Sequence, residues 1–508
     1  MINRGKISPS AKFSRRFEKK SEKVFLEQKL NNWPGYILFA LLATGMGYIM
    51  AHQVLIGLGI TALIVGFAVV LVCLLNTEAG LYINMAYSFL ISHFNRLLFD
   101  DSLQIGVFSD ILVIVTFLSF FVRRVSLKKS INQFADAPVV IALLACYGLI
   151  FLELFNPSAR FFVGWFPAFR KILATLLILF ISYNVFNTRE SIKRFITVLF
   201  VLCMIVATYG CIQQWHGFFP FEMDWLRGDP KRFRMTFIGG GSRKMSTMND
   251  AVSFAIIMAT CSIFFLALVR SQKKALYRYI MIGGIILMLL GMSYTITRTA
   301  NAMLVAGVVI FLLLSFDKKS TRLLTLGAAF LFVLVMYAPV QNAQIDQFRQ
   351  TFEGSKDDSY NVREINRKSV QPYIYRHPIG SGLGTTGGEG LQYNPGHELA
   401  GFPPDSGYLK KALELGWIGF ALYCTVYFLV LRTGIRGYFA ARDEDVKRLY
   451  TACTAACFAF YVGDFSQVSI GQITDIVVYY PFIAIILRLK DFNEPEPSID
   501  QSVKTLTA

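Results

Sequence analysis

Arginines at the ends of apolar runs are the residues of this sequence best suited to chemistry. Arg298 follows the apolar stretch GGIILMLLGMSYTIT and precedes another, so a permanent cation is expected at or near a membrane boundary. A buried guanidinium is costly there unless it meets an anion. An arginine fork can bind phosphate or diphosphate oxygens bidentately, which a lysine cannot do. The alternative is a structural arginine held by a neighbouring carboxylate or helix dipole.

Further cations precede or follow other apolar runs. Arg170, in GWFPAFRK, is expected in the first turns of a helix, where a cation is unfavourable, and Arg160 comes shortly before it. Segment 215–249 carries six lysines and arginines against three acidic residues. Each position alone is also compatible with ordinary surface charge. Together they predict a basic pocket that binds an anionic substrate through Arg160, Arg170, Arg234 and Arg243.

Segment 376–409 reads RHPIGSGLGTTGGEGLQYNPGHELAGFPPDSGYL and adds Arg376 to this set. Gly380, Gly382 and Gly384 allow the backbone to approach a ligand closely, and successive amides in such a run can bind an anion. No βαβ pattern surrounds the glycines, which argues against a dinucleotide site. A flexible loop is the alternative.

Asp405 follows Pro404 at the start of the next apolar run, where it is either the N-cap of a helix or a general base. His397 and His377 are alternative bases. The sequence contains no HExxH, no clustered metal-binding residues and no GxSxG. We therefore expect no metal, no other cofactor and no serine nucleophile.

The composition of the chain indicates which class of fold positions these residues. The chain has 508 residues, of which 54% are apolar and 16% charged, with a mean hydropathy of +0.49. Because one membrane helix needs about 20 apolar residues, the chain is expected to be an all-α polytopic membrane protein with about fourteen transmembrane helices, twelve at the fewest. The predicted runs are 36–51, 54–75, 81–98, 104–122, 138–154, 168–187, 193–214, 250–270, 277–297, 300–316, 322–340, 406–431, 448–465 and 469–488.

The positive-inside rule orients these runs. With a cytoplasmic amino terminus, the basic segments 123–129, 189–194, 270–278, 318–322 and 432–448 all fall inside, and the formal charge of +17 is explained without nucleic acid. Run 81–98 is the least certain transmembrane helix, but omitting it would move the basic segment 123–129 to the outer side and break the alternation. The expected organisation is a basic cytoplasmic tail (1–33), a transmembrane bundle (34–488) with outer segments 155–167, 215–249 and 341–405, and a second cytoplasmic tail (489–508).

Four stretches resemble the bacterial O-antigen polymerase and ligase superfamily, particularly its exopolysaccharide and capsule polymerases. They are Asn156-Pro157 followed by Arg170, SYTITRTANAML, HPIGSGLGT and DSGYLKKALELGWIGF, in that order between about residues 140 and 430. Each motif is short and degenerate, so their joint order carries the resemblance. The family often has histidine and asparagine where this chain has Asp405-Ser406, a departure that fits polymerases better than ligases.

The resemblance implies a membrane-embedded glycosyltransferase in the bacterial plasma membrane. It implies transfer of a polyprenyl-diphosphate-linked glycan to an acceptor sugar on the outer face, with outer arginines binding the diphosphate and Asp405 accepting the proton. Polymerisation of repeat units is the expected reaction, a ligase acting on lipid A core or another acceptor is the alternative, and a flippase of the same lipid is the second. Membrane lipids and a chain-length regulator are the other expected partners.

Overall fold

A computed structural model describes residues 32–123, 127–159, 161–238, 241–316, 319–337, 339, 343–352 and 358–492. Nearly all of the two predicted tails, and Arg160, lie outside the described residues. The chain divides into two compact units, 1–83 with 114–128, and 84–113 with 129–508.

The smaller unit contains two long helices, α2 (Trp33–His52) and α3 (Val54–Leu75), and the adjoining parts of α4 (Thr77–Phe99) and α5 (Ile105–Val122). Asn32 caps α2, because its side chain accepts a hydrogen bond from the amide of Gly35 at 2.9 Å. Most large apolar side chains of α2 and α3 are exposed. Exposed apolar surface on every side of a helix is what a lipid environment requires.

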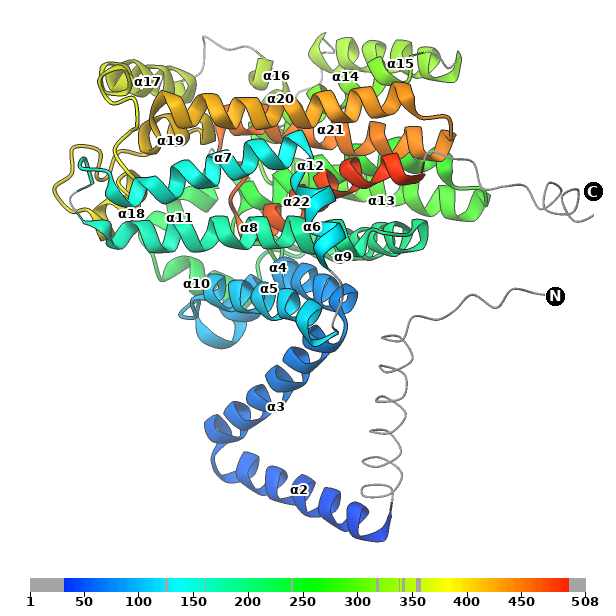
Figure 1. The fold of residues 1–508 in the computed structure, drawn as a ribbon, viewed down its shortest axis with the longest axis vertical. Helices are drawn as coiled ribbons and strands as arrows, with labels where there is room; N and C mark the ends of the chain where they lie inside the picture. Colours follow the sequence, from blue (N-terminus) through cyan, green and yellow to red (C-terminus); the bar gives the residue numbers. More distant parts are fainter. Residues whose placement is uncertain are drawn as a thin grey trace, which may run out of the picture. The chain divides into compact units, whose positions relative to one another are not determined.

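The larger unit is a helical bundle with one short hairpin (Figure 1). Its helices are α6 (Leu127–Ala135), α7 (Pro138–Leu152), α8 (Trp165–Val185), α9 (Arg189–Trp215), α10 (Pro220–Arg227), α11 (Pro230–Thr236), α12 (Ala251–Leu268), α13 (Ala275–Ser293), α14 (Arg298–Leu314), α15 (Lys319–Tyr337), α16 (Ala343–Phe352), α17 (Asp358–Arg376), α18 (Gly387–Tyr393), α19 (Gly407–Glu414), α20 (Gly416–Ala440), α21 (Glu444–Ser466) and α22 (Ile473–Arg488). Strands β1 (Phe237–Ile238) and β2 (Gly241–Ser242) pair antiparallel, with Phe237 opposite Ser242.

Helix α21 lies at the centre of this unit and packs against α12, α14, α20 and α22. Its sequence TACTAACFAF is rich in small residues, which allow neighbouring helices to approach closely. A Cβ on Gly434 of α20 would lie 2.1 Å from Oγ1 of Thr454 in α21. The close packing at the centre therefore depends on small side chains rather than on a large apolar contact.

The predicted all-α membrane class is confirmed. Helices occupy all fourteen predicted runs, and eight of the described helices are long and apolar enough to cross a membrane by length and composition. Helix α4, at the weak run 81–98, is not one of these eight, so the count of fourteen stays a prediction.

One predicted run was wrong in its continuity. Run 406–431 is divided into α19 and α20, with Leu415 between them. Gly416 has φ +66°, and a Cβ there would lie 2.0 Å from the carbonyl oxygen of Pro378. The helix breaks because the chain before Gly380 passes too close for a side chain at this position.

The predicted outer segments carry short helices instead of open loops. Helices α11, α17, α18 and α19 lie together at one end of the larger unit, on the left in Figure 1. Helix α13 ends and helix α14 begins at the chain turn that bears Arg298. We call this the Arg298 end.

Candidate functional site

Arg298 is the first residue of α14 and is half-buried. The turn before it contains Ile296 at φ +52°, a conformation that a β-branched residue rarely adopts. Arg243 holds this turn on both sides of Ile296, because its guanidinium donates to the Thr295 carbonyl and to Oγ1 of Thr297, each at 3.0 Å. The strained turn and its clamp fix where α14, and with it Arg298, begins.

The β hairpin positions Arg243 for this contact. The amide of Arg243 donates to the Thr236 carbonyl at 2.8 Å, and that of Lys244 donates to the Tyr294 carbonyl at 3.1 Å. Burial lowers the pKa of Arg243, although the charge of Asp250 opposes the shift. The two predicted substrate-binding arginines of segment 215–249 therefore differ in burial. Arg243 is partly buried and hydrogen-bonded within the protein, whereas Arg234, in α11, is exposed.

Helix α17 brings two more arginines to the same place. Burial lowers the pKa of Arg298, and the charge of Arg363 lowers it further. One turn further along α17, Arg367 donates to the Phe465 carbonyl at 2.8 Å, and Oγ1 of Thr299 lies 2.8 Å from the Ser466 hydroxyl. The start of α14 is thereby joined directly to the end of α21, and α17 contacts the same end of α21. We call Arg243, Arg298, Arg363 and Arg367 the arginine cluster.

Asp405 reaches this region through the same helix. Its Oδ2 accepts a long hydrogen bond of 3.4 Å from the Asn366 amide, and its side chain is half-buried. The alternative role of Asp405 as N-cap is wrong, because Ser406 occupies that position and its hydroxyl accepts from the amide of Leu409. Asp405 therefore does not cap α19. It contacts α17, the helix that carries two members of the arginine cluster.

A second polar group surrounds α19. Lys410 and Lys171 both bind Glu389, at 2.8 and 3.1 Å, and Lys411 binds the fully buried Asp464 at 2.6 Å. Asp464 also accepts from the Tyr427 hydroxyl at 3.0 Å. We call this set the lysine cluster, with members Lys171, Lys410, Lys411, Glu389, Glu414 and Asp464.

Charge and burial shape the titration of the lysine cluster. Burial would raise the pKa of Glu389, but the ammonium groups of Lys410 and Lys171 outweigh it and lower that pKa to about 2. The carboxylates of Glu414 and Glu389 raise the pKa of Lys410. Glu414 is buried, which raises its pKa despite Lys410, and it accepts from the Thr386 hydroxyl at 2.5 Å. Glu389 and Lys410 are therefore ionised at neutral pH.

Two cavities border the lysine cluster. One has a volume of about 180 Å³ and is lined by all members of the lysine cluster except Asp464, together with Tyr423 and Tyr480. The other, also about 180 Å³, shares Lys171 with the first and is lined by Arg170 and Asp110, which form an ion pair of 2.7 Å. Arg170 of α8 thus pairs with α5 and lines a cavity together with residues of α22. Arg298 begins α14 and interacts with the charge of Arg363 in α17. The single basic pocket predicted from the sequence stays a prediction.

The glycine run is buried and engaged by the protein. Gly380, Gly382 and Gly384 have φ of +81°, +90° and +68°. The amides of Ser381 and Gly382 donate to the carbonyls of Leu413 and Glu414, at 2.8 and 3.0 Å. These bonds satisfy the end of α19, so chain packing explains the glycines, and a ligand role stays a prediction.

The remaining predicted residues are exposed, partly buried, or outside the described residues. Arg376 is exposed in the last turn of α17. His397 is partly buried, and its Nδ1 accepts from the amide of Leu399 at 3.0 Å. Arg160 is outside the described residues.

Several site residues were missed from the sequence. Asp464 ends an otherwise apolar run, and an ionisable group in such a place is itself a signal of function or pairing. Arg96 had weakened the third predicted run, and its guanidinium donates to the carbonyls of Ser246 and Met248, at 3.1 and 2.9 Å. Arg363 and Arg367 carry no distinguishing local pattern.

Residues 283–424 match the family model described as O-antigen ligase. This match supports the resemblance to the O-antigen polymerase and ligase superfamily over that segment. No curated protein matches the chain. The matched segment contains Arg298, Arg363, the glycine run and Asp405. Arg243 and Asp464 lie outside it and contact it, and Arg170 lies outside it and lines a neighbouring cavity.

Proposed function

We propose that this protein is a polymerase-type glycosyltransferase that joins polyprenyl-diphosphate-linked oligosaccharide repeat units on the outer face of the bacterial plasma membrane. The observation that carries the proposal is that Arg243, Arg298 and Arg363 lie together in or beside the segment that matches the O-antigen ligase model. Asp405 contacts α17, the helix that carries Arg363. The basic segments at the opposite ends of the helices support the orientation, with both termini cytoplasmic.

The reaction needs charge stabilisation at one position and a proton acceptor at another. The acceptor hydroxyl oxygen attacks the anomeric carbon of the donor, the bond from that carbon to the diphosphate oxygen breaks, and its electron pair leaves with the diphosphate. The hydroxyl proton passes to Asp405. Because negative charge develops on the leaving diphosphate, preorganised guanidinium groups stabilise the transition state more than the ground state. In this account no metal is required.

Removal of Arg298 tests the proposal. The purified protein is supplied with a synthetic lipid-diphosphate oligosaccharide, and the products are sized. For Arg298→Ala we expect polymer formation to fall by about 10²–10³-fold, the loss typical of removing one such donor, with single repeats accumulating. Arg298→Lys keeps the charge without the fork and should lie between the two.

Lys368→Ala is the matched control, because Lys368 is an exposed cation of α17 that pairs with Glu364 at 2.8 Å. It should leave chain length unchanged. Polymer of normal length from Arg298→Ala would contradict the proposal.

The family description favours one competitor, transfer of the glycan to a non-polymer acceptor by a ligase. The same assay separates the two when lipid A core is offered with the donor. A single transfer onto the core, without longer glycan, would favour the ligase.

A further inference from the structure

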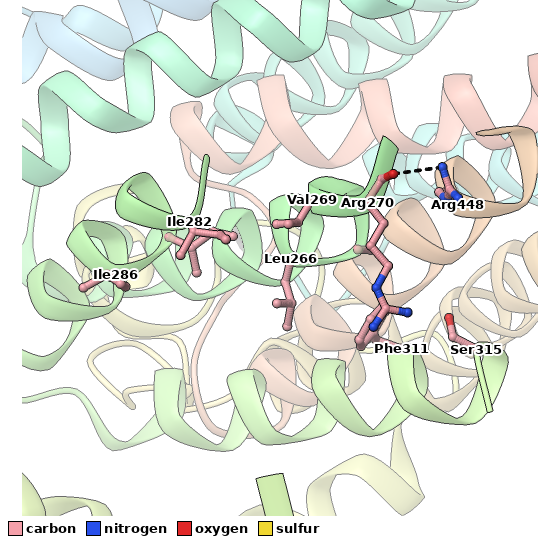
Figure 2. A pocket seen from close by; sticks show the side chains of 10 residues that line it. Leu266, Val269, Arg270, Ile282, Ile286, Phe311, Ser315 and Arg448 are labelled. Carbon is pink, nitrogen blue, oxygen red and sulfur yellow. Dashed lines mark hydrogen bonds between the residues drawn. The ribbon is translucent and has the colours of Figure 1, made fainter. Parts of the chain in front are cut away.

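A cavity of about 270 Å³ lies far from the candidate site, at the opposite end of α13 and α14 from Arg298 (Figure 2). Its wall is formed mainly by apolar side chains of α12, α13, α14 and the short helix Val269–Ser271. These are Leu266, Val269, Ile282, Ile285, Ile286 and Phe311. Ile282 and Ile286 are 38% and 54% exposed, so the apolar side of the cavity opens at the helix surface that faces lipid.

The other side of the cavity is polar. Figure 2 shows the Arg270 side chain extending toward Phe311 and Ser315, away from Ile282 and Ile286. Arg448 of α21 reaches the same place, because its Nη1 donates to the Arg270 carbonyl at 3.1 Å. The Asp445 carboxylate binds Arg448 at 2.9 Å and offsets part of its charge. Two arginines and one hydroxyl therefore line the polar side of the cavity.

We propose that this cavity binds an anionic phospholipid, with an acyl chain in the apolar slot and the phosphate at Arg270 and Arg448. Within a bilayer, an apolar slot that opens to the helix surface is accessible to hydrocarbon and unfavourable for water. Guanidinium groups bind phosphate oxygens bidentately, and basic pockets between membrane helices on the cytoplasmic side are suited to anionic headgroups. The positive-inside rule places the basic segments 270–278 and 432–448 on that side.

A phospholipid satisfies both halves of the cavity better than another protein surface does. A second copy of the chain would have to offer an apolar side chain and a carboxylate at the same spacing, and the net charge of +17 makes a second copy repulsive. The occupant we infer is therefore a lipid with one negatively charged phosphate headgroup.

Native mass spectrometry of the full-length protein tests the inference without any glycan. The detergent-purified protein is titrated with phosphatidylglycerol or with phosphatidylcholine of the same acyl chains. We expect preferential retention of phosphatidylglycerol. Removing each arginine, in Arg270→Gln and Arg448→Gln, should weaken that retention by about fivefold. Ile286→Trp fills the slot without changing charge and should weaken retention of both lipids.

Arg278→Gln is the control, because Arg278 is an exposed cation of the same basic segment and does not line the cavity. It should retain phosphatidylglycerol as the wild-type protein does. Equal loss in Arg278→Gln and Arg270→Gln, equal retention of the two lipids, or a dimer that excludes lipid would each overturn the inference. Because no glycan donor is present, failure here leaves the polymerase proposal untouched.

Discussion

The arginine cluster and the lysine cluster both gather cations near the Arg298 end, but they compensate charge differently. In the lysine cluster every described lysine binds a carboxylate, at 2.6 to 3.1 Å. In the arginine cluster Arg243 donates to a carbonyl and a hydroxyl, Arg367 donates to a carbonyl, and Arg363 opposes the charge of Arg298. Lysines held by carboxylates stabilise structure, whereas several guanidinium groups gathered in one place favour an incoming anion.

The number of lysines and arginines in a region therefore does not identify the candidate site. Arg170, another predicted substrate-binding arginine, forms an ion pair with Asp110. We therefore expect substitutions in the lysine cluster to reduce stability first, and those in the arginine cluster to reduce activity first.

The largest effect is expected from breaking the Lys411–Asp464 pair. Asp464 is fully buried and the Lys411 side chain is 13% exposed, so Asp464→Asn leaves a cation without its partner in a low-dielectric interior. The free energy of unfolding should fall by about 3–5 kcal/mol. Thermal unfolding in detergent measures the loss as a lower Tm.

The double variant Lys411→Met with Asp464→Leu is the control for this prediction. It removes both charges and should recover much of the lost stability, because a buried pair can be replaced by apolar residues at little cost. A single variant as stable as the wild-type protein would show that the pair contributes nothing and would remove the contrast.

A smaller effect, and a different one, is expected at Arg243. Arg243→Ala releases the strained turn before Arg298, so Arg298 loses its position although it remains in the chain. Misplacement of a catalytic group by about 1 Å can cost about 10²-fold in rate, and we expect kcat to fall by about that factor with a smaller change in KM. Steady-state kinetics with the lipid-diphosphate donor separates the two constants.

Arg243→Lys should recover little of the rate, because a lysine cannot make both hydrogen bonds of the clamp. Exposed Arg234 provides a comparison within the same outer segment. If Arg243→Ala lowered Tm as far as Asp464→Asn while sparing kcat, the division between the two clusters would be wrong.

Local sequence predicted the elements of this fold because membrane helices depend on local apolar runs. All fourteen runs are helical, and Arg298 lies at a helix start, as its place between two runs implied. The break between α19 and α20 was not predictable, because it comes from Pro378, 38 positions before Gly416 by their residue numbers. Sequence periodicity carries no information about such an approach.

The pairings within the site required tertiary structure. Arg243 meets Thr295 across 52 positions and Lys411 meets Asp464 across 53 positions. The structure places Lys410, Lys411 and Glu414 around one cavity, together with Lys171 and Glu389 from distant parts of the sequence. Which cation would be paired and which would face another cation could not be read from residue type, since both clusters use the same charges at similar helix ends.

The smallest effect is expected at the outer edge of the lysine cluster, at Glu389. Its carboxylate is about one-third exposed, so Glu389→Gln should cost no more than about 1 kcal/mol of stability at neutral pH. Lys410 and Lys171 lower the folded-state pKa of Glu389 from 4.5 to about 2. Its stabilisation is therefore fully present above pH 4.5 and is lost as the pH falls toward 2. The difference in Tm between the wild-type protein and Glu389→Gln should stay constant from pH 5 to 8 and shrink below that range, and a difference that instead grew on acidification would show that Glu389 is not held ionised by its two lysines.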